Sequence, residues 1–327
     1  MATPFFSVII TTFNRAALLK QALKSLQAQT FRDFEVFVYD DASTDNTQDI
    51  VKDFQAEPGW KFVKLAKNSG YPYAKNLAFR ELQGKYVAFL DSDDVWLPNK
   101  LQVFHEYITT NPAAGFIFSN GFIHQDGYIL SKMFNETAAI PSGMLPAYMA
   151  VSNHWLPYVT TNVALKAEAV KQAGFYREDM AYLGDTEYFA RIMKNHATGV
   201  IPEPLSIYRI HGISITQNRD KCIDESVMTL DSTNPPKDIY DMLYDLIYYS
   251  QSVVLIKNGQ CGKAREYLGK LKLRTSSYYK SYIFTFIPPF ILGAIRFCFK
   301  KLRIAKLILT RTRDFIKAEN LFNSLKN

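Results

Sequence analysis

The sequence predicts an α/β fold, with a mixed, mostly parallel central sheet flanked by helices and a helical extension at the C-terminal end. Short apolar runs alternate with segments whose apolar residues recur at helical spacing, which is the pattern of βαβ units. Aspartates follow two of these runs, at the edge where a parallel sheet gathers its ligands. A polar, proline-bearing stretch at residues 231–236 marks a change of composition. We therefore expect one domain at residues 1–230 and a helical, basic region at residues 231–327.

The first βαβ unit occupies residues 5–41. Residues 5–12 and 34–39 are apolar and rich in β-branched and aromatic side chains, so each run predicts a strand. Between them, residues 18–27 carry leucine and alanine at helical spacing. The second strand is followed by Asp41, which places this carboxylate at the carboxyl edge of the sheet.

The later elements follow the same logic, although the pattern is less regular. We expect a sharp turn at Asp126-Gly127, after which the sheet continues in an antiparallel manner. The remaining predicted helices are one capped at residues 43–45 and running through 50–54, then 74–82, one from about Pro98, 166–172 and 185–194, and, beyond the change of composition, 239–256 and 264–272. The remaining predicted strands are 61–65, 86–90, 115–119, 159–164, 200–201 and 208–216.

The composition is that of a globular protein, with 48% hydrophobic and 21% charged residues. The three cysteines lie far apart without a C-x-x-C pair, which argues against a zinc knuckle or a disulfide framework and fits a reduced, cytoplasmic location. The opening MATPFFSVII has no basic segment or cleavage site before the first predicted strand, so we expect no secretory signal.

The positive charge is concentrated at one end of the chain. Residues 251–327 contain 16 Lys and Arg against three acids, a sum of +13, whereas the whole chain carries +7. This asymmetry assigns any attraction for anionic surfaces to the C-terminal region. No recognisable RNA- or DNA-binding module accompanies it, so nucleic acid is not an expected partner.

An apolar segment at residues 282–299 lies inside this basic region. Two prolines and an arginine interrupt it, and a spanning helix needs about 20 apolar residues, so it does not predict a membrane span. The lysines and arginines on both sides suit a helix lying in the interface of an anionic membrane. The alternative is a helix packed on the first domain with its basic face in solvent.

The most informative segment is YVAFLDSDDVWL at residues 86–97. An apolar strand ends there in Asp91, Asp93 and Asp94, and like charges this close resist ionising together. A Mn²⁺ or Mg²⁺ ion is the natural neutraliser, because such an ion takes oxygen ligands and bridges carboxylate to diphosphate. The segment therefore indicates nucleotide chemistry, with an ordinary capped turn before a helix as the alternative.

Several segments, in this order, resemble the inverting glycosyltransferases of family 2. They are SVIITTFNR at residues 7–15, SLQAQTFRDFE at 25–35, DDASTDNT at 40–47, NSGYPYAKN at 68–76, GKYVAFLDSDDVW at 84–96, AGFYRED at 173–179, LGDTEYFARI at 183–192 and IPEPLSIYRIHGIS at 201–214. The likeness covers residues 5–216. It implies the GT-A fold, which is Rossmann-like, and a hexosyltransferase that moves a sugar from a nucleotide-sugar to an acceptor.

The resemblance also implies roles for residues around the nucleotide-sugar. Thr11 and Asp41 would line the pocket for the base, with Asp41 accepting a hydrogen bond from uracil. Asp91 would contact the ribose, and Asp93 would hold the Mn²⁺ or Mg²⁺ ion. Lys75 stands where the family often has arginine; a lysine still neutralises phosphate but cannot form a fork of two bonds.

The family places its catalytic base in an E-D-x-x-x-x-x-R pattern, and residues 184–191 here read GDTEYFAR. The resemblance implies that Asp185 is the base, which takes the proton of the acceptor hydroxyl during an in-line displacement with inversion. Gly184 replaces the family's glutamate. Glu187 is a competitor for the role, and Asp185 could instead be only a helix cap.

The resemblance further places His211 at the diphosphate or in the metal shell. Arg209 and Ser214 beside it offer further donors suited to phosphate oxygens. Trp96 and Trp155 could stack on sugar rings or serve only in packing.

The resulting hypothesis is a metal-dependent inverting glycosyltransferase of the bacterial surface-polysaccharide (O-antigen) type. It would move a sugar from a UDP-sugar to a glycan or lipid-linked glycan acceptor, in the cytoplasm at the inner face of the cell membrane, in peripheral contact with anionic lipid. Two alternatives stay open. One is a catalytically silent, membrane-attached subunit that binds nucleotide-sugar, which the loss of glutamate at Gly184 would favour. The other is a nucleotidyltransferase, which shares the metal requirement.

Overall fold

The computed structural model describes residues 3–151, 156, 158–211 and 219–272. The chain divides into two compact units, with the division between residues 214 and 215. The boundary predicted at residues 230 and 231 falls inside a helix, α7 (Arg219–Thr233), and the predicted domain division stays a proposal. The two units are described in turn.

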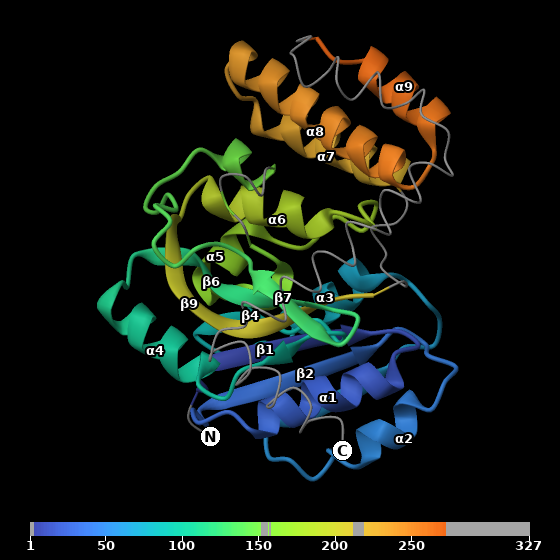
Figure 1. The fold of residues 1–327 in the computed structure, drawn as a ribbon. Coiled ribbons are helices and arrows are strands. Elements are labelled where there is room, and N and C mark those ends of the chain that lie inside the picture. The colour runs from blue at the N-terminus through green and yellow to red at the C-terminus, as the bar shows by residue number, and fades with distance from the viewer. Residues whose placement is uncertain (1–2, 152–155, 157, 212–218, 273–327) are drawn as a thin grey trace. The chain divides into compact units, whose positions relative to one another are not determined.

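The first unit is built on one mixed sheet with the strand order β3-β2-β1-β4-β8-β6-β9-β5, and β7 pairs with β6 (Figure 1). The pairs among β1 to β4 and the pair β6–β9 are parallel, whereas β8, β7 and β5 pair antiparallel with their neighbours. The strands are β1 (Phe6–Thr12), β2 (Phe34–Asp40), β3 (Trp60–Lys64), β4 (Tyr86–Phe89), β5 (Val95–Trp96), β6 (Ala114–Gln125), β7 (Tyr128–Lys132), β8 (Val163–Lys166) and β9 (Ala197–Ile210).

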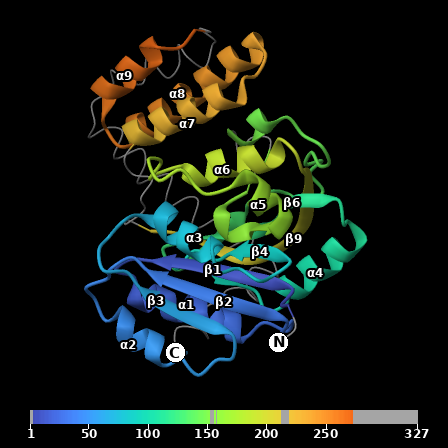
Figure 2. The ribbon, with the colours of Figure 1, turned by 180° about the vertical axis from the view of Figure 1, so that it is seen from behind.

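Helices cover both faces of this sheet (Figures 1 and 2). One core packs α1, α2 and α4 against one face, and a second core packs α3, α5 and α6 against the other. Alternate residues of β1 explain the two cores, since Val8 points to the first and Ile9 to the second. The helices of this unit are α1 (Ala16–Gln27), α2 (Thr47–Lys52), α3 (Tyr71–Phe79), α4 (Lys100–Thr110), α5 (Ala167–Ala173) and α6 (Gly184–Met193), with short 3₁₀ helices at Ala147–Val151 and Thr160–Asn162.

The predicted α/β fold, a mixed and mostly parallel sheet flanked by helices, is confirmed. The predicted turn at Asp126-Gly127 joins β6 to β7; both residues have positive φ, 53° and 88°, as the tight turn of a hairpin requires. The strand expected at 200–201 and the first residues of the one expected at 208–216 belong to a single strand, β9, which ends at Ile210; residues 212–216 lie outside the described residues. Pro202 and Pro204 obscured this strand, and the pairing register with β6 shifts at this place, which is how a strand accommodates prolines.

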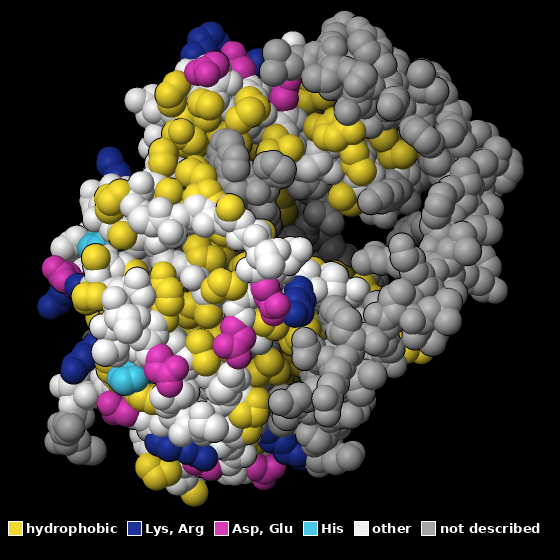
Figure 3. Space-filling model, turned by 60° about the vertical axis from the view of Figure 1, so that its left-hand side comes forward, with side chains coloured by type: hydrophobic (Ala, Val, Ile, Leu, Met, Phe, Trp, Pro, Cys, Tyr) yellow, Lys and Arg dark blue, Asp and Glu magenta, His cyan; other side chains and the backbone are white. Residues whose placement is uncertain are grey.

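The second unit contains α7, α8 (Lys237–Lys257) and α9 (Cys261–Gly269). The predicted helices at 239–256 and 264–272 correspond to α8 and α9, whereas α7 was not predicted. In the parts of the chain that the structure describes, no helix combines the length and apolar character needed to cross a membrane. The apolar segment at residues 282–299 lies outside the described residues. On the face in Figure 3, acidic and basic side chains of the described residues are interspersed.

Lys100, at the start of α4, is buried with 1% of its surface exposed. Its Nζ donates to Ser119 Oγ at 3.2 Å and lies 4.3 Å from the centre of the Phe104 ring, and burial lowers the pKa of this amine well below its usual value. We expect Lys100→Met to raise the free energy of unfolding at pH 7 by about 1 to 3 kcal/mol, the usual cost of a buried polar group with too few hydrogen bonds.

The pH dependence of the free energy of unfolding provides a second check. The amine binds its proton more readily in the unfolded chain, so wild-type stability should rise as the pH increases from the lowered pKa of the folded state toward that of the unfolded chain. Urea unfolding at several pH values measures this slope. The Met variant should lose it, while the control Lys67→Met, at an exposed site, should keep it. Parallel pH curves for wild type and Lys100→Met would contradict the prediction.

Candidate functional site

Three neighbouring parallel strands end at the same edge of the sheet. In the register, Thr11 of β1 lies opposite Tyr39 of β2, and Ile9 lies opposite Phe89, the last residue of β4. Asp41 and Asp91 therefore follow strands on either side of β1, and half-buried Thr11 lies between these strand ends. The structure thus brings together Thr11, Asp41 and Asp91, as the sequence predicted for the carboxyl edge of a parallel sheet.

Asp41 is buried and holds the loop that precedes α3. Its Oδ1 accepts the backbone N–H of Ser69 at 2.7 Å, and its Oδ2 accepts that of Gly70 at 2.8 Å. Gly70 has φ 86°, a conformation that suits glycine. Each carboxylate oxygen has a second lone pair, so these contacts leave capacity for a base imide. Asp41 therefore shapes the pocket edge whether or not it also contacts a nucleotide.

The turn after β4 carries the three carboxylates Asp91, Asp93 and Asp94. Burial raises the pKa of Asp91 to about 7, the charge of Lys75 lowers it, and the charges of Asp93 and Asp185 raise it further. Burial and the two neighbouring carboxylates raise the pKa of Asp94 well above its usual value. The turn therefore holds more acidic groups than it can ionise, which is the condition that a bound cation relieves.

Asp93 is the carboxylate of this turn that is held ionised. Its Oδ2 lies 2.6 Å from Arg15 Nη1 and 2.8 Å from His211 Nε2. Burial acts to raise its pKa, but the hydrogen bond from His211 and the charge of Arg15 outweigh burial, so the pKa of Asp93 is lowered. The structure thus brings together the two residues predicted as metal ligands, Asp93 and His211.

The residues present suit a divalent ion that shares its shell with a ligand. Within residues 3–211 and 219–272, apart from the undescribed gaps, no three His, Cys, Asp or Glu side chains gather into a metal cage. Asp93 and His211 form a pair, and Mg²⁺ commonly binds through one or two carboxylates with substrate phosphates and water, while Mn²⁺ accepts carboxylate oxygen and imidazole. In addition, Oδ2 of buried Asp94 makes no hydrogen bond within the described chain.

Arg209 has a different role from the predicted one. It is buried, and its Nε donates to the backbone oxygen of Asp93, its Nη1 to Gln21 Oε1 at 2.5 Å, and its backbone N–H to Asp94 Oδ1 at 2.9 Å. Its guanidinium is directed at protein acceptors and so braces the acidic turn against α1. The prediction that Arg209 offers donors to phosphate is wrong, because these donors are engaged in the fold.

Asp185 lies in the first turn of α6, where the helix dipole stabilises a carboxylate. Its Oδ1 is 2.6 Å from Nζ of Lys75, which comes from α3 and is buried among the rings of Tyr71, Phe89 and Tyr176. The Asp185 side chain is 22% exposed, so it remains accessible from solvent. Lys75 thus links the predicted base to the acidic turn, since its charge also acts on Asp91.

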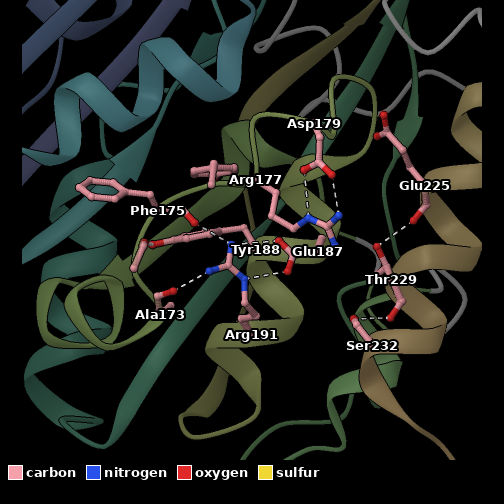
Figure 4. Close-up of polar contacts among 12 residues, drawn as sticks. Ala173, Phe175, Arg177, Asp179, Glu187, Tyr188, Arg191, Glu225, Thr229 and Ser232 are labelled. Carbon is pink, nitrogen blue, oxygen red and sulfur yellow. Dashed lines mark hydrogen bonds and ion pairs between the residues drawn. The ribbon is translucent and has the colours of Figure 1, made fainter.

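The competitor for the base, Glu187, is engaged elsewhere. Arg191 pairs with it through two hydrogen bonds, Nε to Oε1 at 2.7 Å and Nη2 to Oε2 at 2.9 Å, and also donates to the backbone oxygens of Ala173 and Phe175 (Figure 4). The Glu187 side chain is only 5% exposed. Glu187 and Arg191 therefore tie α6 to the loop after α5, which leaves Asp185 as the accessible carboxylate of the motif.

Gly184, which stands where the family has glutamate, lies close to the side chain of Tyr71. A Cβ at Gly184 would lie 3.1 Å from the hydroxyl oxygen of Tyr71, closer than nine in ten such contacts. Part of the space that a larger side chain would need is thus taken by Tyr71, which also lies over Lys75. The hydroxyl of Tyr71 therefore borders the position where the family's glutamate would begin.

Two further predictions concern aromatic and loop residues. Trp96 is 1% exposed and its Nε1 donates to the backbone oxygen of Thr161 at 2.9 Å, so it serves in packing rather than in stacking on a sugar. Trp155 and Ser214 lie outside the described residues.

Sequence reasoning missed Phe13 and Arg15, which follow β1 directly. Phe13 is 42% exposed, two residues after Thr11. Arg15 contacts Asp93 from 78 positions away in sequence. The motif SVIITTFNR contained both residues, but no spacing rule indicates which strand end an arginine reaches.

Comparison with known proteins adds independent evidence. Residues 7–165 match the family described as Glycosyl transferase family 2. The UDP-Glc:alpha-D-GlcNAc-diphosphoundecaprenol beta-1,3-glucosyltransferase WfaP of Escherichia coli is 26% identical over 218 residues, which are 66% of this chain and 81% of that protein. For other curated relatives the match spans less than two thirds of their own length, from 65% down to 29%.

Solved structures share the fold. The structure of S. aureus TarS 1-349 in complex with UDP-GlcNAc has a TM-score of 0.59 and 18% identity, covering 85% of this chain and 79% of that chain. The mannosyltransferase PcManGT from Pyrobaculum calidifontis in complex with GDP-Man and Mn²⁺ has a TM-score of 0.55 and 17% identity, covering 99% of this chain and 86% of that chain. These likenesses confirm the predicted GT-A fold. With the family match, they show that this chain carries a glycosyltransferase family 2 domain of the GT-A type.

Proposed function

We propose that this chain is a metal-dependent inverting glycosyltransferase that moves a sugar from a UDP-sugar to a lipid-linked glycan. The observation that supports it most is the meeting of three groups at one sheet edge: the acidic turn, the His211–Asp93 pair, and the Lys75–Asp185 pair. The family match and the UDP-sugars named for WfaP and for the TarS complex support the choice of donor.

The donor pocket in this proposal is formed by the ends of β1, β2 and β4. Thr11 and Asp41 lie at the base, Asp91 at the ribose, and Lys75 near the phosphates. Asp93 and His211 hold Mn²⁺ or Mg²⁺, which, when bound, offsets the charge that develops on the departing diphosphate. The Mn²⁺ in the PcManGT complex is consistent with such an ion.

The proton of the acceptor hydroxyl is taken by Asp185. A base in an in-line displacement must lie opposite the leaving group and be ionised. Lys75 holds Oδ1 of Asp185 at 2.6 Å and so orients the carboxylate. The charge of Asp185 also adds to burial in raising the pKa of Tyr176 well above its usual value, so this wall of the site stays neutral.

The acceptor is proposed from chemistry as well as likeness. WfaP acts on a sugar diphosphate of undecaprenol, which resides in a membrane, and this motivates a lipid-linked glycan here. We further propose that the chain takes part in surface-polysaccharide synthesis of the O-antigen type. It would act at the inner face of the cell membrane, in peripheral contact with anionic lipid. The basic region at residues 251–327 supports the membrane contact through its charge of +13.

Product analysis tests this proposal against the two alternatives. Purified protein is incubated with UDP-, GDP- and dTDP-sugars, Mn²⁺ and undecaprenol-linked acceptors. We expect free UDP and a glycan extended by one sugar of inverted anomeric configuration. Pyrophosphate as the product would favour a nucleotidyltransferase. Binding of UDP-sugar without turnover on any acceptor would favour the silent subunit, for which the replacement of glutamate by Gly184 is the supporting observation.

A further inference from the structure

Arg15 occupies the same carboxylate oxygen that the proposed metal ion requires. It lies in the loop between β1 and α1, and its Nη1 is 2.6 Å from Oδ2 of Asp93. His211 Nε2 reaches that same oxygen at 2.8 Å. A cation supplied by the chain itself therefore neutralises Asp93.

A divalent ion at Asp93 and the guanidinium of Arg15 cannot share this position. Both are positive, and an ion held jointly by Asp93 and His211 would lie at Oδ2, the oxygen that Arg15 and His211 both approach. In a site that is largely buried, such like charges repel strongly because water screens them poorly. Arg209, also positive and held in place beside the turn, adds to this repulsion. Arg15 must leave Asp93 when the ion arrives.

The Arg15 side chain is accessible to solvent, while the backbone beside it is held. The Arg15 side chain is 25% exposed, whereas Arg209 is 6% exposed and bonded to the fold. The preceding residue, Asn14, is anchored: its N–H donates to Ser43 Oγ at 2.8 Å, and its Oδ1 accepts the N–H of Thr44 at 2.8 Å. Movement is therefore limited to the side chain, which rotates from a fixed point at the edge of the donor pocket.

We propose that Arg15 is a positioning residue that couples metal binding to donor binding. It holds Asp93 while the site is empty and transfers to diphosphate oxygens of the donor when the dication takes Asp93. A guanidinium suits both partners, since its planar donors match carboxylate and phosphate alike. This inference rests on the proposed function. It implies that Arg15 opposes a dication alone but favours a dication that arrives with a nucleoside diphosphate.

Two binding measurements on Arg15→Gln test whether Arg15 weakens the binding of Mn²⁺ alone and strengthens the binding of UDP with Mn²⁺. Electron paramagnetic resonance of free Mn²⁺ gives the affinity for Mn²⁺ alone, and calorimetry gives the affinity for UDP at saturating Mn²⁺. We expect Mn²⁺ alone to bind about tenfold more tightly than to wild type, and UDP about tenfold more weakly, each the size of one charge-assisted hydrogen bond. We expect the affinity for UDP without Mn²⁺ to be unchanged, so by linkage the factor by which Mn²⁺ and UDP strengthen each other should fall about tenfold.

Matched variants separate this mechanism from a structural defect. Arg32→Gln changes an exposed arginine before β2, at the opposite edge of the sheet, and should leave both affinities at wild-type values. Arg15→Lys keeps the charge and should still compete with Mn²⁺, while thermal unfolding checks that each variant is folded. Unchanged or weaker binding of Mn²⁺ alone in Arg15→Gln would overturn the inference and leave the proposed function intact. No coupling between Mn²⁺ and UDP in wild type would overturn both.

Discussion

Asp185→Asn should reduce sugar transfer by about 10³-fold while leaving Mn²⁺-dependent UDP binding within about twofold of wild type. The asparagine keeps the size of the side chain and can still accept a hydrogen bond from Lys75, but it cannot take a proton from the acceptor hydroxyl. Turnover of UDP-sugar with a lipid-linked acceptor and calorimetry of UDP measure the two quantities. Because Lys75 is buried and loses a charged partner, the variant should also be less stable.

The control for this experiment lies in the same segment of the chain. Asp179, between α5 and α6, pairs with Arg177 at the surface, Nη2 to Oδ2 at 2.7 Å (Figure 4). Asp179→Asn should therefore leave turnover within about twofold of wild type, since exposed ion pairs contribute little. Normal turnover in Asp185→Asn would remove Asp185 from the role of base. Loss of UDP binding together with turnover would indicate a structural defect instead.

Asp93→Asn should have the second large effect, on metal-coupled nucleotide binding. The carboxylate oxygen that Arg15 and His211 approach would be replaced by an amide, which is a poor ligand for a hard dication. We expect the affinity for UDP in the presence of Mn²⁺ to fall about 100-fold, the size of effect that loss of groups supporting a metal site produces. Calorimetric titrations of UDP with and without Mn²⁺ measure it.

Asp53→Asn provides the matched comparison for Asp93→Asn. Asp53 is an exposed aspartate that follows α2, so its substitution removes one negative charge without touching the acidic turn. UDP binding in this variant should match wild type at every Mn²⁺ concentration. A similar loss in both variants would assign the effect to net charge, and an unaffected Asp93→Asn would move the metal away from this turn.

Much of the fold followed from local patterns in the sequence. The apolar runs before Asp41 and Asp91 predicted two strand ends at one sheet edge, and the structure brings these residues together. One helix boundary was predicted too late in the chain. Helix α3 begins at Tyr71, earlier than expected, because Pro72 is tolerated in a first helical turn.

The site was predicted less completely than the fold. Asp93 and His211, which the family resemblance implied as metal ligands, lie together, whereas the pairing of Lys75 with Asp185 was not predicted. The proposed roles of these residues await experiment. Two arginines show the limit: Arg209 was predicted to face phosphate, but its guanidinium bonds to the backbone of the acidic turn, and Arg15, for which no role was predicted, pairs with the carboxylate of Asp93. Only the spatial arrangement distinguishes them. The pairing of Glu187 with Arg191, by contrast, was readable from their spacing of four residues along a helix.

The central claim is that the turn after β4 recruits a divalent ion that holds the diphosphate of the donor. Calorimetric titration of wild-type protein with UDP, in EDTA and then in Mn²⁺, tests it most directly. We expect the affinity for UDP to rise at least about tenfold in Mn²⁺. Equal affinity under the two conditions would contradict the claim.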